Sequence, residues 1–277
     1  MHVSWPVGRD WFLVFGLICV ATRADAWWVT LPCVISIGLV QYAIGEALLH
    51  EASHYHLFRG DRRWNDFWGA LCALPFFTTL RDWRAEHLQH HRRFGTVDDH
   101  IVQDYAAHRL TGPSPHIGWV WFGKPLLGLT IFRHLHGLGE INSAGGWMKI
   151  AAFWIPVLTV CRFQHLLAEL ALYWFVPQLT VFATLLHWSE IGDHYRTRNG
   201  SRSRTGRFHN WLFHNNGYHA VHHRFPAVPF TELASVHGAP GPVSSDVTRG
   251  WWGVWRQISR PGEPRPEQWA AFWPEDP

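Results

Sequence analysis

Residues 27–54 read WWVTLPCVISIGLVQYAIGEALLHEASH and combine a long apolar run with a pair of histidines. The run from Trp27 to Leu49 has 23 residues and a single charge, Glu46. At 1.5 Å per residue, a helix of this length reaches about 34 Å, enough to cross a hydrocarbon core about 30 Å thick. The stretch therefore predicts a membrane-spanning helix that ends at the motif His50-Glu-Ala-Ser-His54.

A second apolar run of similar length extends from Leu166 to Trp188. Each long run follows a shorter one, Trp11–Ala21 or Trp147–Cys161, after a brief polar link at Thr22–Ala26 or Arg162–His165. The shorter runs are below the usual minimum of about 17 residues for a span. The pattern predicts an all-α integral membrane protein with about four transmembrane helices in two hairpins. We expect the first run to be a retained span, because no cleavage site for a signal peptide follows it.

The composition agrees with a membrane protein that carries a large polar part. Charged residues make up 16% of the chain, hydrophobic residues 47%, and tryptophan occurs 19 times. Tryptophan concentrates at membrane–water interfaces. The net charge of +3 is modest and the arginines form no stripe, so we expect no nucleic-acid partner. The four cysteines lie in apolar stretches and form no CxxC pair, which argues against a thiolate site.

Two further histidine clusters, His87-Leu-Gln-His90-His91 and His219-Ala-Val-His222-His223, repeat one spacing. Residues three and four apart share a helix face, so each cluster can point several imidazoles in one direction. With His50 and His54 the clusters supply eight histidines, whereas one zinc takes about four ligands. The sequence therefore predicts a two-metal site, and ligands that are all imidazole favour a redox-active pair such as iron.

A ninth ligand and several supporting groups are also predicted. Glu190 and His194 lie four residues apart just after the last long run, and we expect His194 to be a ligand. Metal-bound imidazoles usually donate their other N–H group to a carboxylate or carbonyl. The candidates for such hydrogen bonds are Glu51, Asp98, Asp99, Glu190, Asp193 and Asn215.

The two-hairpin topology places all three clusters on one side of the membrane. Ten of the 24 arginines and lysines fall between His50 and Gly146, and another ten follow Trp188. Basic residues concentrate on the cytoplasmic side. We therefore expect a cytoplasmic, helical, histidine-rich cap. Residues 1–235 are expected to form the membrane domain with this cap, and residues 236–277, rich in Gly, Pro and Ser at their start, a polar tail.

The chain resembles the membrane fatty acid desaturase family, which includes related hydroxylases and ketolases. The family's three histidine boxes, HxxxH, HxxHH and HxxHH, match residues 50–54, 87–91 and 219–223. Further matches are Trp83-Arg84, Asp98-Asp99, Asp193-His194 and the sequence NNGYHAVHHRFP at residues 215–226. The resemblance covers about Trp27 to Pro229.

This resemblance implies two iron ions, dioxygen as co-substrate and two external electrons per turnover. It implies hydrogen abstraction from an unactivated C–H bond, followed by a second hydrogen loss to an alkene or by oxygen transfer to an alcohol. The chain shows no cytochrome or ferredoxin domain, so we expect a separate electron donor of ferredoxin or cytochrome b5 type. The predicted activity is desaturation of a lipid acyl chain.

Three alternatives remain open at this stage. A hydroxylase or ketolase of the same family, acting on a carotenoid or another apolar metabolite, would use the same ligands. An intramembrane zinc protease would use His50, His54 and Glu51, because residues 50–54 also match HExxH. That alternative leaves the other two clusters unexplained. A metal-binding or transport protein would place its ligands near the bilayer midplane, whereas these clusters follow the spans.

Overall fold

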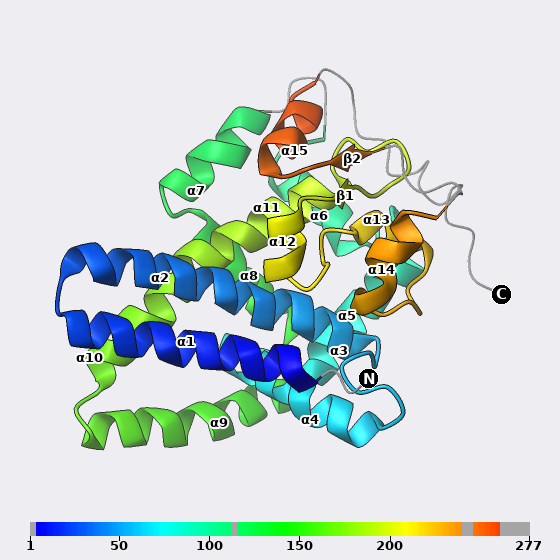
Figure 1. Ribbon diagram of the computed structural model, residues 1–277. Helices are drawn as coiled ribbons and strands as arrows, with labels where there is room; N and C mark the ends of the chain where they lie inside the picture. The colour runs from blue at the N-terminus through cyan, green and yellow to red at the C-terminus, as the bar shows by residue number, and fades with distance from the viewer. Residues whose placement is uncertain (1–3, 112–115, 240–245, 261–277) are drawn as a thin grey trace. The chain divides into compact units, whose positions relative to one another are not determined.

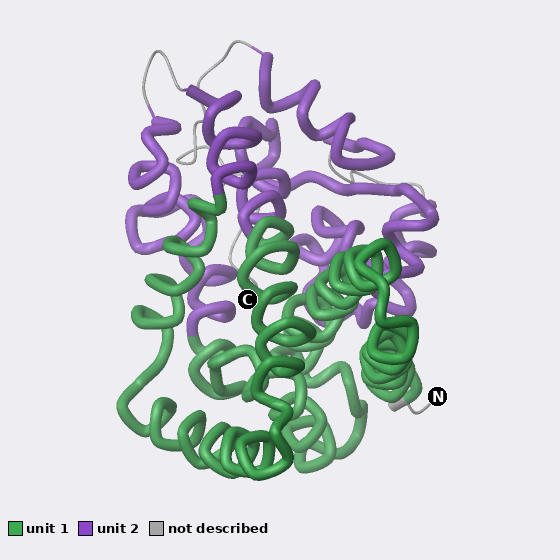
Figure 2. The backbone as a smooth tube through the Cα atoms, turned by 90° about the vertical axis from the view of Figure 1, so that its left-hand side faces the viewer, with its two compact units in different colours: residues 1–85, 128–186 green, residues 86–127, 187–277 purple. Residues whose placement is uncertain are grey.

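The structure is a computed structural model that describes residues 4–111, 116–239 and 246–260 (Figure 1). The regular secondary structure of the described chain is almost all helix, with one parallel pair of two-residue strands, β1 (Ser203–Arg204) and β2 (Val247–Thr248). The predicted all-α class is therefore confirmed. The chain divides into two compact units, coloured separately in Figure 2. Unit 1 comprises residues 1–85 and 128–186, and unit 2 comprises residues 86–127 and 187–277.

Within the described residues, four helices are long and apolar enough to cross a membrane, as predicted. They cover Trp5–Ala24, Trp27–Ser53, Ala144–Phe163 and Leu167–His194. The second comprises α2 (Trp27–Tyr42), the π-helical η1 (Ala43–Leu48) and α3 (Leu49–Ser53). The fourth comprises α10 (Leu167–Leu170), the π-helical η4 (Ala171–Phe175) and η5 (Gln178–Phe182), and α11 (Ala183–His194). The first and third are α1 (Ser4–Ala24) and α9 (Ala144–Phe163).

The first and third spans are longer than the sequence predicted. Prediction began the first span at Trp11 because Arg9 and Asp10 are charged. In the structure α1 continues through both residues, which pair with an N···O distance of 2.6 Å, and Asp10 is buried. A paired charge costs far less to bury than an isolated one. The third span begins after Ser143, whose hydroxyl caps α9 by accepting from the backbone N–H of Gly146.

The spans of unit 1 pack through small residues and buried polar groups. A Cβ atom added to Gly38 of α2 would lie 2.4 Å from Val181 Cβ of η5, so this glycine permits the close approach of the two spans. Gln41 donates to the carbonyl oxygen of Trp174 at 2.9 Å, and the Trp174 indole donates to the Pro75 carbonyl oxygen at 3.2 Å. These bonds satisfy polar groups that have no water partner in a bilayer.

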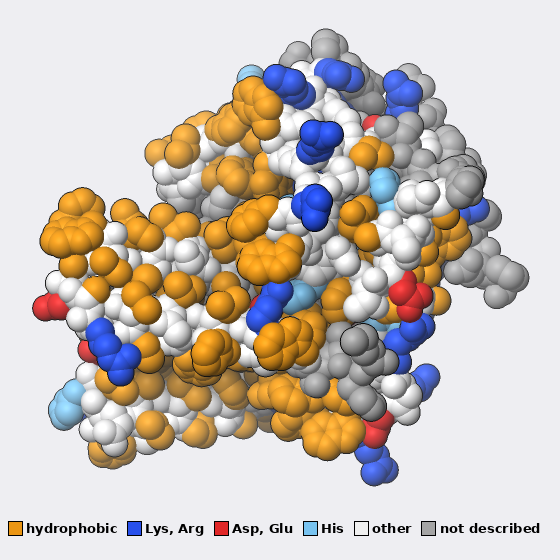
Figure 3. Space-filling view, in the orientation of Figure 1, with side chains coloured by type: hydrophobic (Ala, Val, Ile, Leu, Met, Phe, Trp, Pro, Cys, Tyr) orange, Lys and Arg blue, Asp and Glu red, His pale blue; other side chains and the backbone are white. Residues whose placement is uncertain are grey.

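The outer surface of the unit 1 spans is apolar. Phe12, Trp27 and Phe163 are exposed over 77%, 73% and 76% of their surface. Figure 3 shows hydrophobic side chains over α1 and α2. Such a surface suits contact with lipid. The unit also contains α4 (Arg62–Ala73), the 3-10 turn η2 (Leu74–Phe76), the start of α5 (Leu80–Arg92) and α8 (Thr130–Ile141).

Unit 2 has its own hydrophobic core. The core contains Phe94, Ile101, Tyr105, Leu110, Ile117, Val120, Trp121, Ile191, Tyr195, Val254 and Ile258. Consecutive carbonyls of a π-helical turn, η3 (Trp119–Gly123), accept hydrogen bonds from His187 and Trp188 of α11, both at 2.8 Å. The other helices are α6 (His100–Ala107), α7 (Lys124–Leu126), α12 (Arg207–Leu212), α13 (His219–Arg224), α14 (Phe230–His237) and α15 (Trp251–Ile258).

The segment predicted as a polar tail contains α15. Val254 and Ile258 of this helix are fully buried in the unit 2 core. Residues 240–245 and 261–277 of the predicted tail lie outside the described residues. The boundary near residue 235 stays a prediction.

Candidate metal centre

The first histidine motif lies at the carboxyl end of the second span, in α3. Glu51 is buried, and its two carboxylate oxygens lie 3.4 Å from His50 Nδ1 and 3.3 Å from His56 Nδ1. A carboxylate accepts hydrogen bonds, so it favours a His50 imidazole that is protonated on Nδ1. The Nε2 lone pair of His50 is then available to a metal ion.

Arg84 holds the end of this motif within unit 1. Its guanidinium donates to the carbonyl oxygens of Ser53 and Ala52 at 3.1 and 2.9 Å. It also pairs with Asp66 at 2.6 Å and lies 4.0 Å from the centre of the Tyr55 ring. These carbonyls are among those left without helical partners where α3 ends. Arg84 therefore fixes the backbone that carries His50 and His54.

The second motif lies on α5 and serves two separate groups of ligands. His87 and His91 are one turn apart, and their Nε2 atoms lie 3.1 Å apart. His90 lies beside them, but its Nε2 atom is 3.4 Å from His223 Nε2 instead. Three histidines within five residues thus point in two directions.

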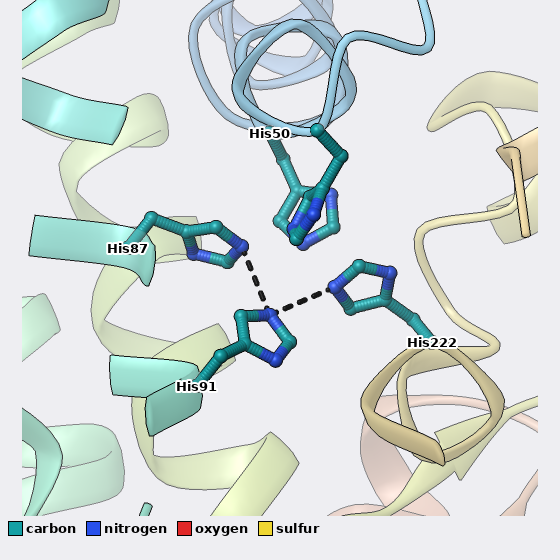
Figure 4. A group of neighbouring side chains, drawn as sticks. His50, His87, His91 and His222 are labelled. Carbon is teal, nitrogen blue, oxygen red and sulfur yellow. Dashed lines mark hydrogen bonds between the residues drawn. The ribbon is translucent and has the colours of Figure 1, made fainter. Parts of the chain in front are cut away.

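The third motif, on α13, completes two triads in unit 2. His222 Nε2 lies 3.0 Å from His91 Nε2, and Figure 4 shows His91 between His87 and His222. These three form the first triad. The second triad is His90, His194 and His223, and within each triad the candidate ligand atoms lie within 4.8 Å of one another. His219 Nε2 lies 3.0 Å from His194 Nε2, so it adjoins the second triad.

The hydrogen bonds around the second triad fix the imidazole tautomers. His194 Nδ1 is 2.8 Å from the Gly200 carbonyl oxygen, and His90 Nδ1 is 2.8 Å from an oxygen of Asp99. Both partners are acceptors, so each Nδ1 must carry the proton. The Nε2 atoms of His90 and His194 then turn lone pairs toward their neighbours. Converging lone pairs repel one another, and a metal cation between them satisfies all of them.

The pKa values in the centre support neutral, ligand-ready imidazoles. The pKa of His223 is well below its usual range, mainly because the ring is buried and secondly because of its electrostatic interaction with the neighbouring His219. Burial and the nearby His50 lower the pKa of His54 to about 3. For Asp99, burial opposes ionisation, but the electrostatic interaction with His90 and the hydrogen bonds from His90 and Gly95 lower the pKa to about 2. Metal binding requires deprotonated imidazoles, and His54 and His223 meet that requirement at neutral pH.

The six predicted supporting residues differ in what they contact. Asp99 contacts His90, and Glu51 contacts His50 and the unpredicted His56. Asp193 instead accepts from Ser189 and pairs with the buried Arg204.

The remaining three supporting candidates are Asn215, Asp98 and Glu190. The Asn215 amide donates to the Phe230 carbonyl oxygen at 2.8 Å. Asp98 is exposed, and Glu190 is partly exposed one turn before His194.

Several contacts of the centre were not predicted from sequence. His56, which stands outside the three histidine motifs, is buried against Glu51. His100 forms a further group with His90 and Asp99. The Gly200 carbonyl has no side-chain signal at all. No sequence signal pointed to Arg204, because only the structure shows that Arg202 and Arg204 are fully buried and must therefore have acidic or carbonyl partners.

Comparison with known proteins gives the family. A family model described as Fatty acid desaturase matches residues 25–252. The chain belongs to the fatty acid desaturase family. The family prediction and the predicted enzyme class, a membrane-bound desaturase or oxygenase, are thereby confirmed.

Individual relatives of this desaturase-family chain are distant. It is 26% identical to dihydrorhizobitoxine desaturase of Bradyrhizobium elkanii, over 90% of the chain and 78% of the relative. It is 25% identical to a temperature-sensitive sn-2 acyl-lipid omega-3 desaturase (ferredoxin) of Arabidopsis thaliana, over 88% of the chain and 63% of the relative. It is also 25% identical to a chloroplastic omega-3 fatty acid desaturase of Ricinus communis, over 87% of the chain and 60% of the relative. The chain thus spans about three fifths of the plant relatives.

Proposed function

We propose that the chain binds two iron ions and uses dioxygen to desaturate a lipid acyl chain. The observation that carries the proposal is the presence of two histidine triads in unit 2, each with converging ligand nitrogens. The proposed ligands are His50, His54, His87, His90, His91, His194, His219, His222 and His223. Their spacing matches the family's three boxes with one additional histidine. Imidazole suits several transition metals, and the oxidative family favours iron.

The residues of the chain have distinct roles in this proposal. The bound irons and dioxygen supply the oxidising power to remove hydrogen from an unactivated C–H bond. His90 and His194 are oriented by Asp99 and the Gly200 carbonyl, which keep their Nε2 atoms unprotonated. Glu51 orients His50 in the same way.

Two substrate classes deserve a direct comparison. Relatives named for acyl-lipid substrates favour a fatty acyl chain. The relative named for dihydrorhizobitoxine favours the alternative of a specialised metabolite. Hydroxylation or ketolation of a carotenoid-like substrate uses the same ligands and is the alternative reaction. Desaturation is favoured because the relatives reported above are all named desaturases.

The proposal includes a separate electron donor, of ferredoxin or cytochrome b5 type, and a cytoplasmic position of the histidine clusters. A relative whose name includes ferredoxin supports the first part. The distribution of arginine and lysine supports the second.

Product analysis and metal analysis together test the function. The full chain is expressed in an iron-supplemented, lipid-producing host, and total lipids are analysed by mass spectrometry before and after hydrolysis. A product two mass units lighter than its precursor supports desaturation, and a product that gains ¹⁸O from ¹⁸O₂ supports the oxygenase alternative. The purified protein should contain about two irons per chain.

Matched histidine variants make the result specific. His222→Ala should abolish product formation and lower the iron content, because His222 belongs to the first triad. His136→Ala is the control, because His136 is an exposed histidine outside both triads. One zinc and no iron in the wild-type protein would contradict the proposal and favour the zinc-protease alternative.

A further inference from the structure

Exposed arginines gather on one part of unit 2. They are Arg198, Arg207, Arg249, Arg256 and Arg260, and we call them the arginine face. Pairing of β1 with β2 brings the segments before α12 and α15 together. A Cβ atom added to Gly206 would clash with the Arg249 carbonyl oxygen. The backbone at Gly206 and Arg207 therefore lies directly beside the backbone at Arg249. Figure 3 shows Lys and Arg side chains close together over α15, the strand pair and α12.

The arginine face carries a strong excess of positive charge. Among the described residues between 196 and 260, Glu232 is the only exposed acidic residue, and it lies on α14. Asp193 and Asp246, the other acids close to this region, are buried. A surface with one sign of charge attracts partners of the opposite sign and accelerates their association.

Exposed aromatic side chains accompany the arginines. Phe208 is 70% exposed, Trp211 61% and Trp252 62%. The Arg256 guanidinium lies 5.7 Å from the centre of the Trp252 ring. Aromatic residues and arginine are the residue types enriched at protein–protein interfaces. The combination of charge and aromatic surface is therefore suited to a protein partner with an acidic surface.

A chain of contacts leads inward from this face to the second triad. Trp251 is next to Trp252 on α15. The guanidinium of Arg204 stacks over the Trp251 ring, 4.2 Å from the ring centre. Arg204 is fully buried and pairs with both oxygens of Asp193. Asp193 directly precedes His194. Every member of this path belongs to unit 2.

Burial of the Arg204 guanidinium in this path has a high free-energy cost unless its charge is compensated. A buried arginine is tolerated only when its charge is paired and its donors are satisfied. Arg204 meets both conditions, because its Nε also donates to His209 Nε2 at 3.3 Å. The result is a short, continuous series of bonded and stacked groups between an exposed tryptophan-bearing helix and a proposed iron ligand. Electron transfer favours short, contiguous paths of this kind.

We propose that the arginine face is the docking surface for a small acidic one-electron carrier protein, and that Trp251, Arg204 and Asp193 form the electron path to His194. The inference rests on the proposed function. In each transfer the carrier is oxidised by one electron and one ferric ion held by the histidines is reduced to ferrous, so two carriers supply one turnover. A membrane surface with anionic headgroups would be attracted by the same arginines, but it would have no use for the inward path.

Binding of a reduced [2Fe–2S] ferredoxin to the detergent-purified full chain tests the docking surface. Arg249→Glu combined with Arg256→Glu should weaken binding by about tenfold or more and flatten its salt dependence. Arg62→Glu combined with Arg63→Glu is the control, because these exposed residues start α4 and undergo the same charge change. The control should change the affinity less than about twofold. Iron content and melting temperature report whether each variant is folded.

Equal weakening in both double variants, or none in either, would overturn the docking surface. So would a loss of binding to phosphatidylglycerol vesicles without a loss of binding to ferredoxin. A wild-type protein that contains no iron would instead refute the proposed function, whatever the binding result.

Stopped-flow oxidation of saturating reduced ferredoxin tests the path. Trp251→Leu should slow the first-order rate by about tenfold while the dissociation constant is unchanged, and Trp251→Phe should restore most of the rate by keeping an aromatic ring. A wild-type rate in the Trp251→Leu protein would exclude the path. Equally slow rates in both variants would indicate a structural role and contradict it too.

Discussion

At the scale of single residues, the histidine centre depends on partners that orient each imidazole. Asp99 accepts from His90 Nδ1 at 2.8 Å and from the backbone N–H of Gly95 at 2.8 Å. It also caps α6 by accepting from the N–H of Ile101. One carboxylate thus links a proposed ligand to the local backbone, so that the ring of His90 cannot turn without breaking a charge-assisted bond.

Asp99→Asn should lower the affinity for iron by about 10- to 100-fold, the usual effect of losing a partner of a ligand histidine. The two oxygens of Asp99 accept from His90 and Gly95 separately. An asparagine amide has only one accepting oxygen, so it cannot replace both hydrogen bonds. Asp98→Asn is the matched control, because Asp98 is the adjacent residue and is exposed. The measurement is iron retained per chain during titration with a competing chelator. Equal retention in the two variants would show that Asp99 does not support the centre.

The positions of the histidines were predictable from sequence, but most of their partners were not. Helical spacing of three and four residues brings His87 and His91 together in any helix that contains them. The Gly200 carbonyl meets His194 because the chain turns back after α11. The pair Asn199-Gly200, with Gly200 at φ 87°, marks a turn there, but it does not show which side chain the carbonyl meets. Arg204 reaches Asp193 across a similar return of the chain. Such contacts follow from the tertiary fold.

At the scale of helices, the spans of unit 1 depend on small residues at their crossing. Gly38→Ala should destabilise the protein by about 1–3 kcal/mol, because the added Cβ lies within 3 Å of two side-chain atoms of Val181. Gly16→Ala is the control, since a Cβ there meets no atom within 4 Å. That change should be neutral or stabilising by up to about 1 kcal/mol. Thermal unfolding in detergent measures both, and an unaltered Gly38→Ala protein would contradict the close packing.

The existence of the four spans was predictable, whereas two of their ends were not. Hydropathy counts Arg9 and Asp10 as two charges that end a span. Their mutual pairing lets α1 continue to Ser4, and hydropathy contains no information about pairing. The long second and fourth spans were easier to predict because their apolar runs alone exceed the required length. The π-helical segments η1, η4 and η5 left no recognisable sequence pattern.

At the scale of the whole molecule, metal binding should contribute to stability. Ligands from α5, α11 and α13 converge only in the folded chain, so a bound ion favours the folded state over the unfolded one. Removing iron with a chelator should therefore lower the melting temperature, and a free metal concentration 1,000 times the dissociation constant corresponds to about 4 kcal/mol. His136→Ala should respond like the wild type and His222→Ala much less. Identical responses in all three would contradict a shared centre.

The charges of the whole chain predict its orientation in the membrane. Ten basic residues lie between His50 and Gly146 and ten after Trp188, whereas the turn near Asp25 follows only Arg9 and Arg23. Alkaline phosphatase fused after Asp25 should therefore be active in a bacterial periplasm, and the same reporter fused after Asn199 should be inactive. Green fluorescent protein at these two positions should give the opposite pattern. A reversed pattern would place the histidines outside the cytoplasm, where cytoplasmic ferredoxin could not reach the arginine face, and would leave the metal ligands themselves unaffected.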